Sequence, residues 1–324
     1  MLDKCLIFYY KITLLSLQKM NSLIFKIFFI SIFVFTVSCK KDPLVINNNN
    51  APYYSEIPTI LLENYVNRIY IDLIGREPLD EEMLKDVQFL RDSEVSLESR
   101  DSLLRKLQFD TTYIIGDSSY KLAYFHRVYE ICKVRLLEGV ANSYISSQLN
   151  NFWNNYINDS LSNDLLSANK GLLNYNILNN VLSSELEYYN GIIEINEMHR
   201  RMIYNSVYDN INMNTFNFIN AAFDNLLFRY PTQYEFDEVY KMIEDNTAQV
   251  VLGVSGNNKE HFTHIICESR EFYEGIIIWT YQTLLARNPN TEETDFLINN
   301  FFVSHDFQWL QRQIMKTDEY AHFN

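Results

Sequence analysis

Glycine and proline are scarce in this sequence, which has 8 Gly and 6 Pro among 324 residues. Both residues interrupt helices and form turns, so their scarcity argues against turn-rich β-sandwiches and barrels. Long apolar side chains are abundant instead: the chain has 23 Tyr and 22 Phe, and 47% of its residues are hydrophobic. The composition therefore predicts an all-α fold with a substantial core.

Clustered basic residues are also missing, and the net charge is −14. Phosphate backbones are bound by grouped Lys and Arg, so we expect no nucleic-acid partner. The sequence also has no Gly-rich phosphate loop, no Gly-x-Ser-x-Gly motif and no Cys-x-x-Cys-His haem attachment motif. We therefore expect a protein that is not an enzyme and that needs no cofactor.

The N-terminal region contains the apolar run LIFKIFFISIFVFTV at residues 23–37, followed by Ser38 and Cys39. A short apolar segment that ends in a small residue and then Cys resembles a bacterial lipoprotein signal peptide. The resemblance implies that residues 1–38 are removed and that Cys39 carries lipid. Met20 is an alternative start, and a permanent membrane helix is an alternative interpretation, although the run after Lys26 is short for a bilayer.

The lipoprotein interpretation implies a cell-envelope location, with the outer membrane of a Gram-negative bacterium as the expected site. Residues 39–58 are polar, Asn-rich and contain three prolines, which is typical of a flexible tether. Cys132 and Cys267 would then remain in the folded part. We expect two buried free thiols there, and a single disulfide is the alternative.

One pattern occurs three times, in residues 65–82, 218–235 and 276–293. Each copy has Pro, with Arg two residues before it, an apolar pair four and five residues before it, an aromatic residue eight before it and Glu four after it. Repetition of this kind indicates repeated structural units rather than one catalytic pocket. The recurring polar residues are Arg76, Pro78 and Glu82, then Arg229, Pro231 and Glu235, then Arg287, Pro289 and Glu293.

The pattern predicts a helix that ends near Arg, a break at Pro and a second helix that starts at once. Thr232 and Asn290 precede Glu by three residues, which is the spacing of a capping box. The first copy has Leu79 at that place, so we expect Asp80 to cap its helix instead. A further helix is expected to close each unit with an apolar residue, a capping residue and an aromatic residue. The three closing sets are Leu107–Asp110–Tyr113, Ile266–Ser269–Phe272 and Ile314–Thr317–Tyr320.

These motifs resemble a helical repeat domain of unknown function that occurs in exported bacterial proteins, with a pattern similar to phycobilisome linker domains. The opening GREPLDEE also resembles the helical domain that accompanies cytochromes in planctomycete proteins. The resemblance covers residues 60–115 and 216–324. It implies a helical fold and an interaction role, and it implies no catalytic residues.

We therefore expect residues 59–140 to form the first unit plus a following helix, bounded by the cap at Ser119 and by Gly139. Residues 141–215 form an Asn- and Tyr-rich helical linking segment, and residues 216–324 form the second and third units. The second unit contains a Gly-bearing insertion at residues 246–258, which we consider the first place to look for function.

Two sets of residues are weaker candidates for a site. His261, His264 and Glu268 have helical spacing and donor atoms that suit zinc, although helix packing explains their neighbours better. The three arginines could bind an acidic partner, but ion pairs with the recurring glutamates are the favoured interpretation. Exposed aromatic residues could stack on sugars. These aromatic residues are Tyr53, Tyr54, Trp153, Tyr188, Tyr189, Trp279 and Trp309.

The sequence thus favours a lipid-anchored envelope protein that binds a protein partner without catalysis. Capture of a glycan for an uptake system is the alternative, and a metal-dependent enzyme is the least favoured interpretation.

Overall fold

The computed structural model describes residues 57–114 and 117–323, which belong to one compact unit, Glu56–Asn324. Among these residues are fifteen helices and one two-stranded hairpin, so the predicted all-α fold is confirmed. In the described residues, no helix is both long enough and apolar enough to cross a bilayer. The helices are α2 (Thr59–Ile74), α3 (Asp80–Asp92), α4 (Leu97–Phe109), α5 (Tyr120–Leu136), α6 (Asn142–Leu161), α7 (Leu165–Tyr189), α8 (Ile195–Ile203), α9 (Ser206–Asn212), α10 (Thr215–Leu227), α11 (Gln233–Glu244), α12 (Lys259–Glu268), α13 (Arg270–Leu285), α14 (Thr291–Ser304), α15 (Phe307–Met315) and α16 (Asp318–Ala321).

The three sequence copies correspond to three groups of helices. The first contains α2, α3 and α4, the second α10, α11 and α12, and the third α13, α14 and α15 with the short α16. The second and third groups are continuous, because Ser269 follows the last residue of α12 and its side chain also caps the first turn of α13. Helix α13 therefore begins the third group directly where the second group ends.

Helix α5 lies between the first group and the linking segment, and its predicted limits are confirmed. The Ser119 side chain caps its N-terminus, and Gly139, with φ of 69°, follows its C-terminus. Tyr124, Val128 and Cys132 are buried along it, which gives the four-residue spacing of a core-facing stripe. Helix α5 packs against α2, α4, α7 and α8, so it connects the first group to the linking segment.

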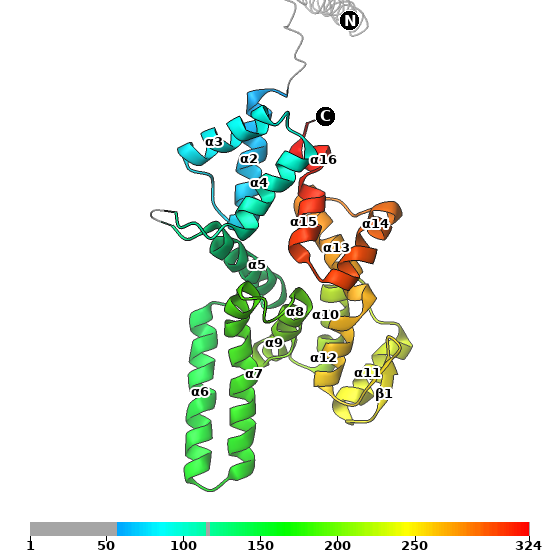
Figure 1. Cartoon of the computed structure of the whole chain (residues 1–324). Helices are drawn as coiled ribbons and strands as arrows, with labels where there is room; N and C mark the ends of the chain where they lie inside the picture. The colour runs from blue at the N-terminus through cyan, green and yellow to red at the C-terminus, as the bar shows by residue number, and fades with distance from the viewer. Residues whose placement is uncertain (1–56, 115–116, 324) are drawn as a thin grey trace, which may run out of the picture. The chain divides into compact units, whose positions relative to one another are not determined.

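The linking segment is dominated by a long helical hairpin, which Figure 1 shows in green. Helix α6 packs chiefly along α7. Only Ile145 and Leu149 of α6 are buried, and both lie in its first half. At 1.5 Å per residue, the 20 residues of α6 extend about 30 Å. The second half of α6 therefore pairs with α7 without contributing a buried residue.

The C-terminal helices pack against the first group, as Figure 1 shows for α15 and α16 beside α2 and α4. Arg68 donates to the Tyr320 carbonyl at 2.7 Å, and the Tyr320 hydroxyl donates to Asp72 at 2.7 Å. Arg100, only 6% exposed, donates to the Lys316 carbonyl at 2.9 Å. These charge-assisted bonds tie the two ends of the domain together.

The Gly-bearing insertion forms the hairpin of strands β1 (Gln249–Val251) and β2 (Val254–Gly256). Leu252 and Gly253 both have positive φ, as the two-residue turn of a tight hairpin requires. A Cβ at Gly256 would lie 2.9 Å from side-chain atoms of His261 and Ile265, so a larger residue would force these side chains to move. The hairpin packs against α11 and α12 as a structural element of the second group.

Candidate functional site

The three repeated turns have the same backbone conformation. The residue three positions before each proline ends its helix in the left-handed region: Gly75 has φ of 76°, Phe228 of 55° and Ala286 of 54°. Glycine adopts this region easily, whereas Phe and Ala do so at a cost of about 1 kcal/mol. The second and third turns therefore keep a conformation that their residues disfavour. In the sequence, only Gly75 of the first turn indicates this conformation.

Each recurring arginine forms a bidentate ion pair with the glutamate six residues later. The same carboxylate accepts the backbone N–H of the residue before the next helix, as in a capping box. This pair fixes the distance between the end of one helix and the start of the next. The arginine–glutamate distances are 2.7 and 2.9 Å for Arg76–Glu82, 2.8 and 2.7 Å for Arg229–Glu235, and 2.8 and 2.6 Å for Arg287–Glu293.

A second acid and an aromatic ring complete each turn. The second acid comes from the segment just after the third helix of the unit and binds the Nε side of the guanidinium. The ring is the aromatic residue eight positions before Pro. The second acids are Asp117 for Arg76, Glu271 for Arg229 and Glu319 for Arg287. The rings are Tyr70, Phe223 and Tyr281, whose centroids lie 5.5, 5.2 and 5.0 Å from the respective guanidinium carbons.

The ion pairs lower the pKa of the glutamates. Burial raises the pKa of Glu82, but hydrogen bonds from Arg76, the Leu79 N–H and the Tyr120 hydroxyl outweigh it and bring the pKa to about 2. Hydrogen bonds from Arg229 are the largest influence on Glu235, whose pKa is also about 2. Both carboxylates are therefore charged at neutral pH, and the arginines are engaged within their own turns.

The first copy differs from the prediction at two places. Leu79, and not Asp80, occupies the cap position of α3, because Glu82 accepts its N–H and α3 then begins at Asp80. The closing set also fails there: Tyr113 is 69% exposed, and Asp110 bonds the Thr112 N–H within a loop. The reason is that the loop continues to Ser119 before α5 begins.

In the other two copies, the closing residues behave as expected. The side chains of Ser269 and Thr317 cap new helices, and the aromatic residues three positions later, Phe272 and Tyr320, are fully buried. In the first copy Tyr120 is buried instead, and its hydroxyl donates to Glu82 at 2.7 Å. Tyr120 directly follows the capping residue Ser119, whereas the predicted pattern places the aromatic residue three positions after the cap. The pattern therefore did not identify Tyr120.

The structure does not bring the metal-like set together. His261, His264 and Glu268 are all exposed at the surface of α12. Glu268 accepts a hydrogen bond from Asn196 at 2.7 Å, and His261 Nδ1 accepts the Asn257 N–H at 3.4 Å. In residues 57–114 and 117–323, no group of three or more His, Cys, Asp and Glu side chains is arranged to hold a metal ion.

Cys132 and Cys267 are both buried free thiols, as the sequence favoured. Cys132 Sγ lies 3.9 Å from His199 Nε2, a juxtaposition that no sequence signature indicated. Burial raises the pKa of Cys132 to about 12 and lowers the pKa of His199 to about 3. A thiol and an imidazole that are both neutral do not form the ion pair of a cysteine nucleophile.

Two of the candidate aromatic residues line an open cavity of about 440 Å³ between the α7–α8 turn and the α14–α15 turn. These are Tyr188 and Tyr189, and the Lys121 ammonium lies 4.2 Å from the centroid of the Tyr189 ring. The Tyr188 hydroxyl donates to Gln308 at 3.4 Å. Further polar groups of the wall are the side chains of Glu194, His305 and Asp306.

The other candidate aromatic residues are placed separately. Trp153 is 44% exposed on α6 and packs near Tyr156 and Tyr175, with ring centroids 5.3 and 5.4 Å away. Trp279 and Trp309 are partly buried against the core. Cys39, Tyr53 and Tyr54 lie outside the described residues.

The tip of the α6–α7 hairpin exposes three leucines. Leu161 is 80% exposed, Leu165 67% and Leu166 83%. Residues 142–184, which include this tip, contain only three charged residues, Asp159, Asp164 and Lys170. Exposed apolar side chains with little charge around them characterise protein interfaces.

No family model matches this chain, and comparisons with curated proteins and with solved structures give no match either.

Proposed function

We propose that this chain is a lipid-anchored protein of the cell envelope that binds a protein partner through the tip of the α6–α7 hairpin, without catalysis. The Cys39 sequence pattern supports the anchor and an outer-membrane location. The three repeated helix–Arg-x-Pro–helix units, which resemble an exported-protein repeat domain, support a scaffold role. The observation that supports binding of a protein partner is the exposed cluster of Leu161, Leu165 and Leu166.

A protein surface fits this tip better than a lipid surface does. Asn158, Asp159, Ser160 and residues 162–164 lie among the three leucines, and all of them are polar. Insertion into a membrane would remove water from these groups without supplying hydrogen-bond partners. A partner protein can accept the leucines in a pocket and offer polar groups to the asparagines around them.

The test is site-specific photo-crosslinking in living cells, with the crosslinker placed at position 166. We expect one defined adduct, which disappears when Leu161 and Leu165 are both replaced by Asn. The same crosslinker at Leu84, which is 72% exposed on α3, is the matched control and should give no such adduct. The Cys39→Ser protein should leave the membrane fraction and lose the adduct as well.

Identical adducts from positions 84 and 166, or none from 166, would contradict the role of the hairpin tip. A Cys39→Ser protein that still sediments with membranes would contradict the lipid anchor. Binding of the purified protein to liposomes that depends on the three leucines would favour a lipid surface instead.

A second candidate function is glycan capture, which the cavity at Tyr188 and Tyr189 favours. Sugars are bound by aromatic faces together with charged and amide groups that bond their hydroxyls, and this cavity offers both kinds of group. We expect Tyr189→Ala to reduce oligosaccharide binding on a glycan array by at least about tenfold, since stacking and hydroxyl contacts are lost together. Trp153→Ala, outside the cavity, is the control. An array with no bound glycan would exclude this candidate.

A further inference from the structure

The second half of helix α6 carries two neighbouring rows of exposed side chains, which together form what is here called the α6 face. The residues of the apolar row are spaced by four positions, so they lie on one side of the helix. They are Trp153, Ile157 and Leu161, which are 44%, 39% and 80% exposed. An amide row with the same spacing lies beside it and consists of the exposed residues Asn150, Asn154 and Asn158.

The same half of α6 lacks the burial that usually stabilises a helix. Residues 150–161 read NNFWNNYINDSL, in which seven of the twelve residues are Asn, Asp or Ser, all weak helix formers. None of these twelve residues is buried. Because most helical stability in proteins comes from packing of an apolar face, a helix of this composition is expected to be covered.

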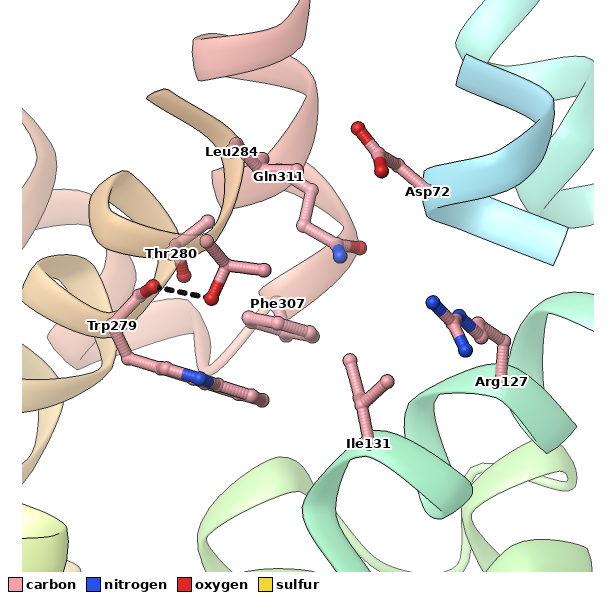
Figure 2. A pocket seen from close by; sticks show the side chains of 9 residues that line it. Asp72, Arg127, Ile131, Trp279, Thr280, Leu284, Phe307 and Gln311 are labelled. Carbon is pink, nitrogen blue, oxygen red and sulfur yellow. Dashed lines mark hydrogen bonds between the residues drawn. The ribbon is translucent and has the colours of Figure 1, made fainter. Parts of the chain in front are cut away.

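The contact between the first and third helical groups shows what a covered apolar surface looks like in this protein. There Asp72 and Arg127 lie opposite Trp279 and Phe307 (Figure 2). The space left between these side chains is about 40 Å³, which is room for a few water molecules. The domain has therefore closed this surface by its own packing, whereas the α6 face is left open.

The distribution of charge favours a second copy of this chain as the covering partner. The whole chain has a net charge of −14, so two copies repel each other over most of their surfaces. Residues 142–184 of the α6–α7 hairpin contain only Asp159, Asp164 and Lys170 as charged residues, which gives a net charge of −1. Two copies can therefore approach each other at the hairpin with little repulsion.

The α6 face is also complementary to itself. In a two-fold dimer both copies use the same patch, so the patch must match its own chemistry. Apolar side chains pack on apolar side chains, and each Asn side chain offers both donors and an acceptor, so amides can pair across the axis. Rows with four-residue spacing are also the ridges that interdigitate when two helices cross.

The hairpin is large enough for such a contact. Its 20-residue helix α6 extends about 30 Å, and two helices side by side are about 20 Å wide, so one side of the hairpin offers about 600 Å². Two copies would then bury about 1,200 Å² in total, which reaches the lower end of the range for stable, specific interfaces.

From these observations we infer that two copies of this chain pair through their α6 faces, so that the two hairpins form a bundle of four helices. This inference rests on the proposed protein-binding role of the hairpin and names its partner. The apolar rows pack against each other, the amide rows pair beside them, and the leucines of the tip extend the contact to the end of the hairpin.

The experiment is cysteine crosslinking of the full chain in membranes, with two co-expressed copies that carry different epitope tags. We expect Ile157→Cys in both copies to give an adduct that contains both tags, because the α6 faces meet in the dimer. Asn155→Cys, at another exposed position, should give at least about fivefold less adduct, because residues two positions apart lie on opposite sides of a helix. The unaltered protein, in which Cys132 and Cys267 are buried, measures the background.

Photo-crosslinking from position 166 of the tagged copies separates this inference from the proposed function. An adduct that contains both tags supports the second copy. An adduct between a tagged copy and a different protein would overturn the second copy and keep the protein-binding role, whereas no adduct would overturn both. Equal adducts from Ile157→Cys and Asn155→Cys would also overturn the inference, because random collision does not distinguish the two sides of α6.

Sedimentation equilibrium of the purified full chain in density-matched detergent measures the dissociation constant of the dimer. Ile157→Asp brings two like charges together in the contact, so it should raise this constant at least about tenfold. Asn155→Asp adds the same charge on the opposite side of α6 and should leave the constant unchanged. Both positions are exposed, so neither change is expected to unfold the domain. A monomer at every concentration, or an equal effect of the two changes, would overturn the inference.

Discussion

Replacing Gly275 by alanine is expected to destabilise the domain by about 3 kcal/mol, because α13 and α10 cross there at close range. A Cβ at position 275 would lie 2.0 Å from the backbone carbonyl oxygen of Leu226, far inside van der Waals contact. A backbone atom cannot rotate away as a side chain can, so the two helices would have to separate. In an ordinary helix the same substitution stabilises by roughly 0.5–1 kcal/mol.

The free energy of unfolding in urea measures this effect. Gly171→Ala is the matched control, since Gly171 is also in a helix and its Cβ would lie 3.4 Å from the Phe152 carbonyl and the Tyr156 nitrogen. We expect the change at Gly171 to be small. Equal effects at the two positions would show that loss of chain flexibility, and not the α10–α13 crossing, determines the result.

The sequence predicted the helical class and the repeated turn because both depend on local chemistry. Arg and Glu six residues apart, with Pro between them, are close enough along the chain for their pairing to be inferred. The second acids were missed because they depend on tertiary structure: Asp117 is 41 residues from Arg76, and Glu319 is 32 residues from Arg287. Only the folded chain brings them together.

The opposite case is the set His261, His264 and Glu268. These residues form a helical pattern in the sequence, but their spacing does not bring their donor atoms to a common point in the structure.

Acidification is expected to reduce stability through His199 before the glutamates are protonated. Its pKa is about 3 in the folded protein because the imidazole is buried, beside Cys132 and the charge of Arg135. In the unfolded chain it titrates near 6.5, so between pH 6.5 and pH 3 the unfolded state binds one more proton than the folded state. Stability therefore falls as pH decreases through this window, by about 1.4 kcal/mol per pH unit.

Urea unfolding at pH 6.5 and pH 4.5 should thus show a loss of about 2 kcal/mol that is absent in His199→Gln. His264→Gln, at an exposed histidine, should keep the loss. Glu82 and Glu235 also make stability fall with decreasing pH, because their pKa values of about 2 lie below the ordinary value of 4.5. Their effect begins at lower pH, where the glutamates of the unfolded chain become protonated. Asp72 has the opposite effect on stability, because burial raises its pKa and the folded state therefore binds a proton more readily there. If the free energy of unfolding of His199→Gln falls with pH as steeply as that of the unaltered protein, the prediction is wrong. His199 would then accept its proton in the folded protein, and burial would not keep its imidazole neutral.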